Sequence, residues 1–453
     1  MKFILKMKKR FTQLTSMAFK ATILAFVVLS TQSIAAQTDK NAVLKSKLDK
    51  LAIAIEPKVI AWRRDLHQNP ELSNRETKTA EKIAKHLRDL KFDEVKTGVA
   101  KTGVVGILRG GKPGPTVALR ADMDGLPVTE RVDLPFKSTV KTTFNGMETG
   151  VMHACGHDSH VAILMGTAEV LSQMKSELAG TIVFIFQPAE EGAPKGEEGG
   201  AGLMVKEGVL DNPKVETIFG LHINSQTPVG TIRYRPAGTM ASSDPLTITI
   251  KGKQTHGAYP WAGVDPIVTG AQIIMGLQTV VSRMTPLNES AAVVTIGSFH
   301  AGIRGNIIPE EAKLVGTIRA LDPKIQKQIH ENIKRVVKNI AESAGAEATC
   351  EIEIGNPVTY NNPELTKKMY PTLEEVAGEQ NVFVTVPVTG AEDFAMYQEK
   401  IPGFFFFLGG MAKGKSAAEV APHHTPDFYI DEGGFTLGIK AFCHLVVDYA
   451  AKK

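Results

Sequence analysis

The stretch VMHACGHDSH, residues 151–160, places a thiol, three imidazoles and a carboxylate close together in the chain. A thiolate beside an imidazole can serve as a nucleophile with its base, and the same two groups can bind a metal ion. A third interpretation is a helix start that is rich in histidine for no catalytic reason. The stretch by itself leaves all three open, so the rest of the chain has to decide between them.

Further reactive groups stand directly after apolar runs elsewhere in the sequence. Functional groups in open α/β sheets gather at the carboxyl ends of strands, so we expect these side chains to converge on one rim. A thiolate, imidazoles and carboxylates from separate elements are a ligand set for divalent metal ions, and this convergence favours a metal site. The groups are Asp122 and Asp124 after VALR, Glu190 and Glu191 after TIVFIFQPA, His222 at the end of TIFGLH, and His423 and His424 beyond FFFFLGG.

Glu190 and Glu191 suggest a division of labour. Adjacent side chains diverge, so one carboxylate can bind a metal ion while its neighbour acts as the general base on an attacking water. Asp122 and Asp124 are interpreted as residues that support the ligands, although direct ligation by Asp122 also stays open.

The other polar side chains in residues 151–160 are weaker candidates for catalysis or metal binding. His153 and His160 have no spacing argument of their own, so we expect supporting or packing roles for them. Asp158 or Ser159 is expected to cap the helix that follows, since both residue types favour that position.

The elements that must position these groups alternate between helix and strand. Residues 41 to about 92 are expected to be helical, with Ser73 as a cap and Glu76 three residues later. The alternation predicts an α/β catalytic domain around a mixed, mostly parallel sheet. The expected strands are 104–108, 116–124, 181–187 and 217–223, and the expected helices between them are 160–174 and 201–210.

The pattern changes after about Ala237. Strand, helix, two strands, helix and strand follow in residues 244–355, which is the order of a ferredoxin-like α+β domain. Its edge strand and long helices would suit dimerisation or a lid. From about residue 356 the α/β pattern resumes, with strands at 382–388 and 404–410 and a last helix at 433–450. We therefore predict a catalytic domain of residues 37–236 and 356–453, interrupted by an inserted domain of residues 237–355.

Residues 1–36 are interpreted as a signal peptide. Six basic residues precede or flank the apolar run ATILAFVVL, and SIAA follows as a cleavage site. A run of nine residues is too short to span a bilayer, so we expect export to the periplasm or medium without stable membrane insertion after cleavage. Without these basic residues, 46 basic and 48 acidic residues remain, and the formal charge falls from +4 to −2. No basic surface for nucleic acid is indicated.

Three cysteines are too few for a disulfide scaffold. The spacing of Cys350 and Cys443 gives no support for a bridge between them. A metal ion would explain how Cys155 stays unpaired in an oxidising compartment.

Nine short motifs in order resemble those of the dinuclear metallo-carboxypeptidase and aminoacylase family. The resemblance is to its amidohydrolase branch, which includes hippurate hydrolases and auxin-conjugate hydrolases, and it covers nearly the whole chain after residue 36. The motifs are LHQNPELSNRE (66–76), LRADMDGLPV (119–128), MHACGHDSH (152–160), FQPAEEG (186–192), GLH (220–222), HGAYP (256–260), GNIIP (305–309), TGAEDF (389–394) and HHTPDF (423–428).

The resemblance implies two divalent metal ions per subunit and Glu190 as the general base. Zinc or manganese is expected, and cobalt or nickel is also compatible with such ligands. His424 is preferred to His423 because it directly precedes a small residue and a proline, whereas His423 stands where the family usually has an apolar residue. The implied ligands are Cys155, His157, Glu191, His222 and His424.

The resemblance also assigns residues of the inserted domain. His256 matches a histidine that reaches the active site of the partner subunit, which implies a homodimer. Asn306 and, less directly, Arg319 match residues that hold the carboxylate of the substrate. The expected activity is cleavage of the amide bond of N-acyl amino acids, such as hippurate-like conjugates, or of small peptides by metal-activated water.

Two other function classes are kept beside this one. In a cysteine hydrolase, Cys155 would attack the substrate with His157 as its base, and Glu191, His222 and His424 would have no task. In a non-catalytic metal-binding or substrate-binding protein, Glu190 would have no task. Inactivation by a chelator separates the metal-dependent hydrolase from the cysteine hydrolase.

Overall fold

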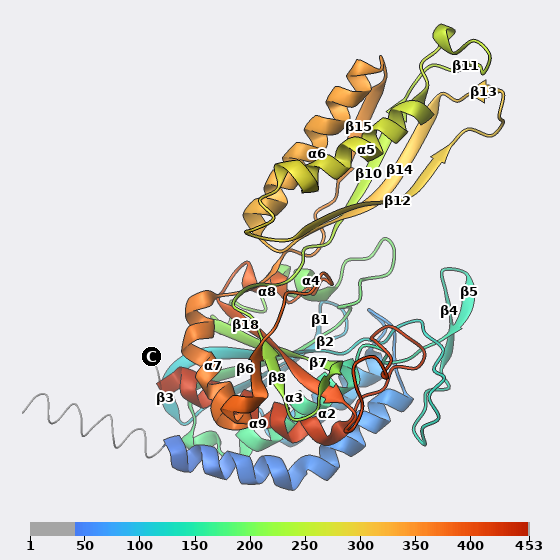
Figure 1. Ribbon diagram of the computed structural model, residues 1–453. Coiled ribbons are helices and arrows are strands. Elements are labelled where there is room, and N and C mark those ends of the chain that lie inside the picture. Colours follow the sequence, from blue (N-terminus) through green and yellow to red (C-terminus); the bar gives the residue numbers. More distant parts are fainter. Residues whose placement is uncertain (1–40, 452–453) are drawn as a thin grey trace, which may run out of the picture.

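The chain folds into two lobes, each built around its own sheet (Figure 1). The structure is a computed structural model that describes residues 41–451. The chain builds most of the larger lobe, passes into the smaller lobe at about residue 241, and returns at about residue 356. Two short strands, β9 (Ala237–Met240) and β16 (Thr359–Asn361), pair where the chain leaves and re-enters.

The larger lobe holds an eight-stranded mixed sheet in the order β1-β2-β6-β3-β7-β18-β8-β17. Its four middle strands, β6, β3, β7 and β18, run parallel to one another. They are covered on both faces, which explains their continuous apolar runs. The strands are β1 (Glu94–Val99), β2 (Gly103–Arg109), β3 (Lys112–Asp122), β6 (Ala179–Gln187), β7 (Thr217–Pro228), β8 (Ile232–Tyr234), β17 (Val382–Val384) and β18 (Gly403–Met411).

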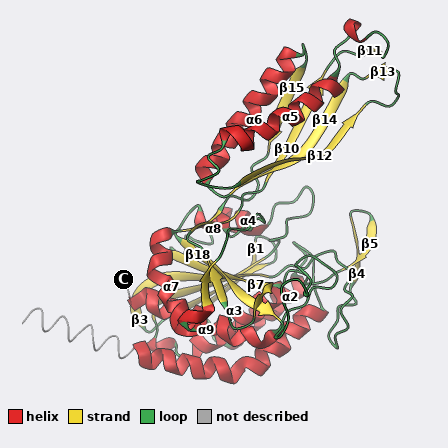
Figure 2. Ribbon diagram, in the orientation of Figure 1, coloured by secondary structure: helices red, strands yellow, loops and turns green. Residues whose placement is uncertain are grey.

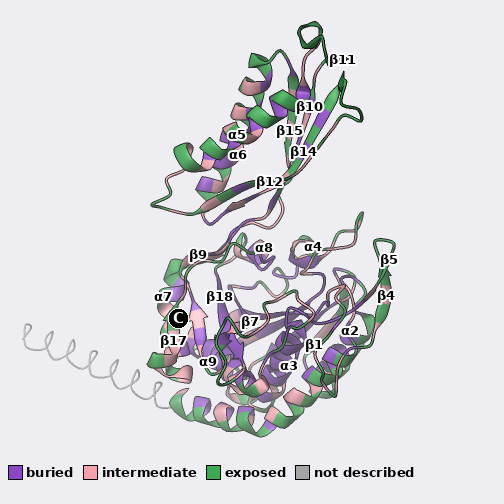
Figure 3. Cartoon of the chain, turned by 45° about the vertical axis from the view of Figure 1, so that its right-hand side comes forward, coloured by how far each residue is buried: buried purple, intermediate pink, exposed green. Residues whose placement is uncertain are grey.

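Helices lie on both faces of this sheet (Figure 2). Helix α3 contacts β3, β7 and α9, and Figure 3 shows it almost wholly buried. The shorter α4 and α8 contact each other and cover the second face with a separate apolar cluster. The helices of this lobe are 41–68, α2 (Thr77–Asp89), α3 (His157–Gln173), α4 (Gly200–Lys206), α7 (Pro363–Ala377), α8 (Ala395–Gln398) and α9 (Phe435–Ala451).

The smaller lobe is an antiparallel four-stranded sheet in the order β12-β14-β10-β15, packed against two helices. Its chain order is the strand, helix, strand, strand, helix, strand pattern expected from the sequence. A hydrophobic core separate from that of the larger lobe holds it together. The elements are β10 (Asp244–Lys251), α5 (Pro266–Met284), β12 (Ala292–Ala301), β14 (Glu311–Ala320), α6 (Pro323–Ser343) and β15 (Glu347–Ile352), with β11 (Thr255–His256) and β13 (Ile307–Ile308) paired at the tip.

Two sequence-based expectations about helix starts are wrong. Residues 41 to 92 form two helices, because the chain breaks at residues 69–76, where Pro70 cannot continue a helix. Ser73 caps neither of them: its hydroxyl donates to Asp124 Oδ2 at 2.7 Å, and Glu76 occupies the N-cap position of α2.

Neither Asp158 nor Ser159 caps α3. Gly156 is its N-cap residue, with a φ of 93°, and the helix begins at His157. The Asp158 carboxylate instead pairs with Arg63 and with His67 inside the larger lobe, at 2.9 and 2.7 Å.

Two further features bear on the sequence-based expectations. Cys350, in β15, and Cys443, in α9, are both free thiols, and they belong to different lobes. The expected signal peptide lies outside the described residues. None of the helices in residues 41–451 combines the length and apolar character that a bilayer span requires.

Candidate metal centre

Cys155 and His157 are positioned by the start of helix α3. Gly156 between them has a positive φ, and a Cβ at that position would approach Cγ2 of Ile223 to 2.5 Å. Only glycine tolerates both constraints, so the turn packs tightly against strand β7. The turn brings the thiol and the imidazole to the segment of β7 that carries His222.

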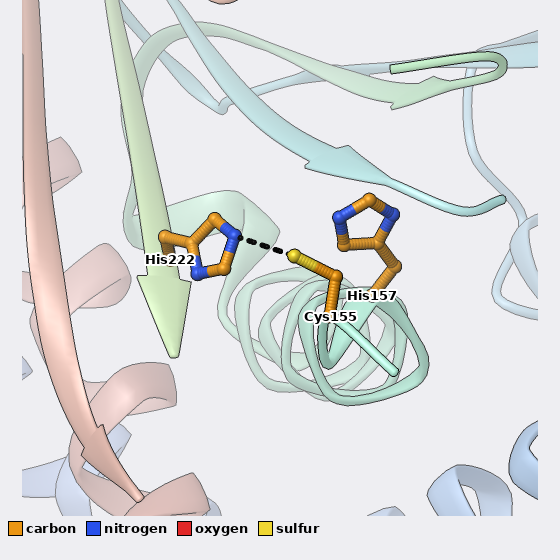
Figure 4. A group of neighbouring side chains, drawn as sticks. All are labelled: Cys155, His157 and His222. Atoms are coloured by element: carbon orange, nitrogen blue, oxygen red, sulfur yellow. Dashed lines mark hydrogen bonds between the residues drawn. The ribbon is translucent and has the colours of Figure 1, made fainter. Parts of the chain in front are cut away.

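Cys155 Sγ lies between imidazoles from three parts of the chain. It is 3.4 Å from Nε2 of His222 and 3.2 Å from Nε2 of His424. Figure 4 shows His222 reaching the sulfur from β7, with the ring of His157 on its other side. His424 lies in the loop beyond β18 with a φ of 63°, and its backbone N–H donates to the Ala154 carbonyl at 2.8 Å.

Glu190 and Glu191 follow strand β6 in a turn that Asp124 holds in place. The backbone N–H groups of Glu190 and Glu191 donate to the Asp124 carboxylate at 3.2 and 3.0 Å. Oε1 of Glu191 then lies 3.1 Å from Nε2 of His424. Oε2 of Glu190 lies 3.8 Å from Nε2 of His157. The two carboxylates therefore lie beside two of the histidines of the cluster.

The hydrogen bonds of the histidines show which lone pairs are free. His157 Nδ1 donates to the Asp124 carbonyl at 3.0 Å, and His222 Nδ1 donates to the Ile223 carbonyl at 2.7 Å. Both Nε2 atoms consequently carry a lone pair toward the cluster. Within residues 41–451, Nε2 of His157 is buried and has no hydrogen-bond partner, and Oε1 of Glu191 lies beside the His424 ring. A buried acceptor without a partner fits a site for metal ions.

The electrostatics of the site also favour cations. Burial and the neighbouring Glu191 and Glu190 raise the pKa of the Cys155 thiol well above its usual range. Burial followed by the charge of Glu392 raises the pKa of Glu190 well above the usual range of a glutamate. A bound divalent ion would reverse both effects, because it favours a thiolate and a carboxylate.

Arg120 supplies positive charge beneath this acidic site, and sequence reasoning missed its role. It is fully buried in β3 and donates to Asp122 at 2.6 Å, to Glu392 at 2.8 Å and to Asp393 at 2.9 Å. The carboxylates of Glu190, Glu392 and Asp393 lie within 4.8 Å of one another. The motif LRADMD contained part of this signal, because an arginine inside apolar surroundings needs an acidic partner, but it did not identify Glu392 or Asp393 as that partner.

Three histidines near the centre have no free lone pair or do not reach the cluster. His160 donates from Nδ1 to Asp122 at 2.5 Å and accepts at Nε2 from the Ile223 N–H at 2.8 Å. His153 is buried, and neither of its ring nitrogens has a partner among residues 41–451. His423 lies beside Cys155 and bonds to the backbone on both sides of its ring.

The resemblance assigned active-site roles to three residues of the smaller lobe, His256, Asn306 and Arg319. None of them reaches the metal centre of its own chain. His256 and Asn306 are exposed in the tip formed by β11 and β13, at the end of the lobe far from the larger sheet (Figure 1). Arg319 lies near the other end of the lobe, where its guanidinium is 3.5 Å from the Ser242 carbonyl.

A cavity of ≈ 750 Å³ adjoins the centre at Glu191. It is bounded by the loops after β3 and β6 and by the hairpin of β4 (Lys141–Phe144) and β5 (Met147–Gly150). Leu72, Leu126 and Phe144 give part of its lining an apolar character. Its volume lies within the range of ordinary small-molecule sites.

Comparison with known proteins identifies relatives along nearly the whole length of the chain. Residues 118–448 match the family described as peptidase family M20/M25/M40. Thermostable carboxypeptidase 2 of Saccharolobus solfataricus is 41% identical over 414 residues, which is 90% of this chain and 100% of that protein. N-acetylcysteine deacetylase of Bacillus subtilis is 39% identical over 399 residues, 87% of this chain and 97% of that protein.

A solved structure is also similar. A Bacillus subtilis protein described as a dinuclear metal binding peptidase superposes with a TM-score of 0.73 at 37% sequence identity. The match covers 87% of this chain and 98% of that one.

Proposed function

The chain belongs to peptidase family M20/M25/M40 and is a metal-dependent hydrolase of peptide or amide bonds, and we propose that it releases amino acids from N-acyl amino acids or small peptides. One observation carries the proposal: five potential ligands from four parts of the chain meet around the buried Nε2 of His157, which has no hydrogen-bond partner among residues 41–451. We assign as metal ligands Cys155, His157, Glu191, His222 and His424.

Two divalent ions held by these residues would polarise the scissile carbonyl and lower the pKa of a neighbouring water molecule. Thiolate and imidazole ligands favour zinc, while the carboxylates keep manganese, cobalt and nickel open.

Glu190 is the proposed general base. Its side chain is only 9% exposed and does not need to serve as a ligand, because Glu191 beside it faces His424. Glu190 takes a proton from water as the water oxygen bonds to the amide carbon. It then passes that proton to the nitrogen when the C–N bond breaks, which gives a carboxylic acid and an amine.

The names of two relatives support the proposal for the amino-acid side of the substrate. A carboxypeptidase and an N-acetylcysteine deacetylase both cleave an amide next to an amino acid with a free carboxylate. Asn306 and Arg319 are the proposed partners of that carboxylate. Because they lie at opposite ends of the smaller lobe, Asn306 would come from the partner subunit and Arg319 from the chain that holds the metal ions. The cavity beside Glu191 is the proposed place for the acyl group. Because His256 and Asn306 lie far from their own centre, we propose that the smaller lobe forms a homodimer and presents them to the partner subunit.

Export is a further part of the proposal. It depends on the basic residues, the short apolar run and the SIAA boundary within residues 1–36. Mass spectrometry of protein recovered from the periplasm or medium should show a chain that begins near Ala36 or Gln37.

The experiment that tests the proposed activity is removal and return of metal. Protein treated with a chelator and dialysed should lose hydrolysis of N-acyl amino acids. Zinc, manganese, cobalt and nickel, added one at a time, should restore it to different extents. Activity that persists after complete removal of metal would contradict the proposal.

The same experiment separates the two alternatives. A cysteine hydrolase would be insensitive to metal and would be blocked by alkylation of Cys155. The structure disfavours it, because no hydrogen bond joins Cys155 to His157 in the described chain and the raised thiol pKa disfavours a thiolate nucleophile. A binding protein would take up metal and substrate without any turnover.

A further inference from the structure

The loop that brings His424 to the cluster also places His423 against the backbone of Cys155. Nδ1 of His423 lies 3.2 Å from the Cys155 carbonyl oxygen, and Nε2 accepts from the Ser225 N–H at 3.2 Å. Both contacts are satisfied by a neutral ring that carries its hydrogen on Nδ1. The imidazole therefore links the loop before α3 to strand β7.

This hydrogen-bond pattern separates His423 from the proposed ligands. His222 uses Nδ1 for a backbone carbonyl and leaves Nε2 beside the sulfur at 3.4 Å. In His423 both nitrogens are engaged, so no lone pair remains for a metal ion, although Nδ1 is only 3.7 Å from the same sulfur. His160 is engaged in a similar way, since its Nε2 accepts from the Ile223 N–H of the same strand.

The backbone at Cys155 needs a hydrogen bond to hold it because the next residue is glycine. Gly156 has a positive φ and no side chain that could restrict the backbone. The preceding carbonyl, of Ala154, is held by the His424 N–H, and the Cys155 carbonyl is held by His423. The loop after β18 thus holds the Cys155 segment at two successive carbonyls.

We propose that His423 is a positioning residue for the hydrolase, which holds the Cys155 carbonyl so that the thiolate stays at the metal ions. The proposal rests on the proposed function, because it takes Cys155 as a metal ligand. It also gives a role to the histidine that departs from the family pattern. Groups that orient metal ligands typically change metal affinity by about 10–100-fold when they are removed.

Two isosteric variants separate the two bonds of His423. The side-chain N–H of asparagine can occupy the place of Nδ1 and donate to Cys155, while the side-chain oxygen of glutamine can occupy the place of Nε2 and accept from Ser225. Cobalt(II) is titrated into the metal-free full-length protein, and the thiolate-to-cobalt charge-transfer absorption reports whether Cys155 is a ligand. We expect His423→Asn to keep the absorption, and His423→Gln to lose or shift it with about 10–100-fold weaker cobalt binding.

A matched control accounts for the general effect of replacing a buried histidine. His444 is buried outside the centre and lies 2.9 Å from Asp49, so His444→Gln should lower the melting temperature without changing the cobalt spectrum. Equal behaviour of His423→Asn and His423→Gln, or retention of the absorption by the glutamine variant alone, would overturn the proposal. Cys155→Ser tests its premise: if the absorption survives in that variant, Cys155 is not a ligand, and the assigned ligand set is what fails.

Discussion

The carboxylate of Glu190 shares its surroundings with two acidic side chains to which the sequence assigned no role. Glu392 and Asp393 lie close to it, and both are anchored by the fully buried Arg120. Without metal ions, burial and these negative charges favour the protonated form of Glu190. Bound divalent ions would favour the carboxylate, which can take a proton from water and return it to a leaving nitrogen.

Replacing Glu190 by glutamine tests this role at the scale of one residue. Glu190→Gln should lower kcat by about 10²–10⁴-fold, because a glutamine amide cannot accept the proton. Its metal content, measured by atomic emission, should match that of the parent. Glu191→Gln is the contrast, since it should reduce metal content as well as activity. A Glu190→Gln enzyme with normal kcat would remove Glu190 from the mechanism.

At the scale of elements, helix α2 is joined to the catalytic turn through its N-cap residue. The Glu76 carboxylate accepts from the Ala189 N–H at 2.8 Å and from the Thr102 hydroxyl at 2.5 Å. Burial and the nearby Asp124 raise the pKa of Glu76 to about 7. Between pH 4.5 and about 7, Glu76 is therefore mostly protonated in the folded protein and mostly ionised in the unfolded chain.

This pKa predicts a pH dependence of stability. A carboxyl with a folded pKa of about 7 and an unfolded pKa near 4.5 makes its full contribution to the free energy of unfolding below pH 4.5, and this contribution is lost as the pH rises through 7. Glu76→Gln mimics the protonated form. The free energy of unfolding of the variant should therefore equal that of the parent at pH 4.5 and exceed it by up to about 3 kcal/mol at pH 8. Urea unfolding of both proteins at several pH values measures the difference. A constant difference across this range would contradict the assignment.

The β4–β5 hairpin is the element that closes the cavity beside Glu191. Phe144 lines the cavity, whereas Met147, which pairs with it in the hairpin, is 70% exposed and does not. Phe144→Ala should lower kcat/KM for N-benzoyl amino acids about tenfold relative to N-acetyl amino acids, because a large acyl group loses an apolar contact. Met147→Ala should leave that ratio unchanged. Equal effects in both variants would exclude the cavity as the acyl site.

Periodicity and apolar runs were sufficient to predict most elements of the fold. The apolar, aromatic run of strand β18 predicted a strand that is covered on both faces, and the strand is buried along its whole length. The second helix was expected to start at Ser73 and begins at Thr77 instead, because the Ser73 hydroxyl donates to Asp124, which lies far along the chain. The start of α3 was missed because Gly156 is selected by its close approach to Ile223, which is a contact between distant parts of the chain.

Prediction of the site shows a similar limit. The candidate ligands could be recognised because each follows an apolar run or belongs to a motif. The partners of Arg120 could not, since Glu392 lies 272 positions away and nothing local indicates their pairing. The hydrogen bonds of His423 could not be predicted either, because they join distant parts of the chain and depend on the paths of β7 and the loop after β18.

At the scale of the whole molecule, the two lobes divide the proposed machinery. The larger lobe contains the candidate ligands and Glu190, whereas His256 and Asn306 lie together at the tip of the smaller lobe. The backbone N–H of Gly257 donates to the Asn306 carbonyl at 2.8 Å, which fixes the two residues in one unit. A histidine so placed can assist hydrolysis if another subunit brings its centre to the tip.

Mixed dimers test this arrangement directly. Subunits with His256→Ala and subunits with Glu190→Gln should each form inactive or weakly active dimers. When they are unfolded and refolded together, one centre of each mixed dimer would combine an intact Glu190 with an intact His256 from the other subunit. Random assortment makes about half of the dimers mixed, with one competent centre of two, so about a quarter of the parental activity should return. Differently tagged subunits allow the mixed species to be isolated. If purified mixed dimers stay as inactive as either variant alone, His256 does not act across subunits.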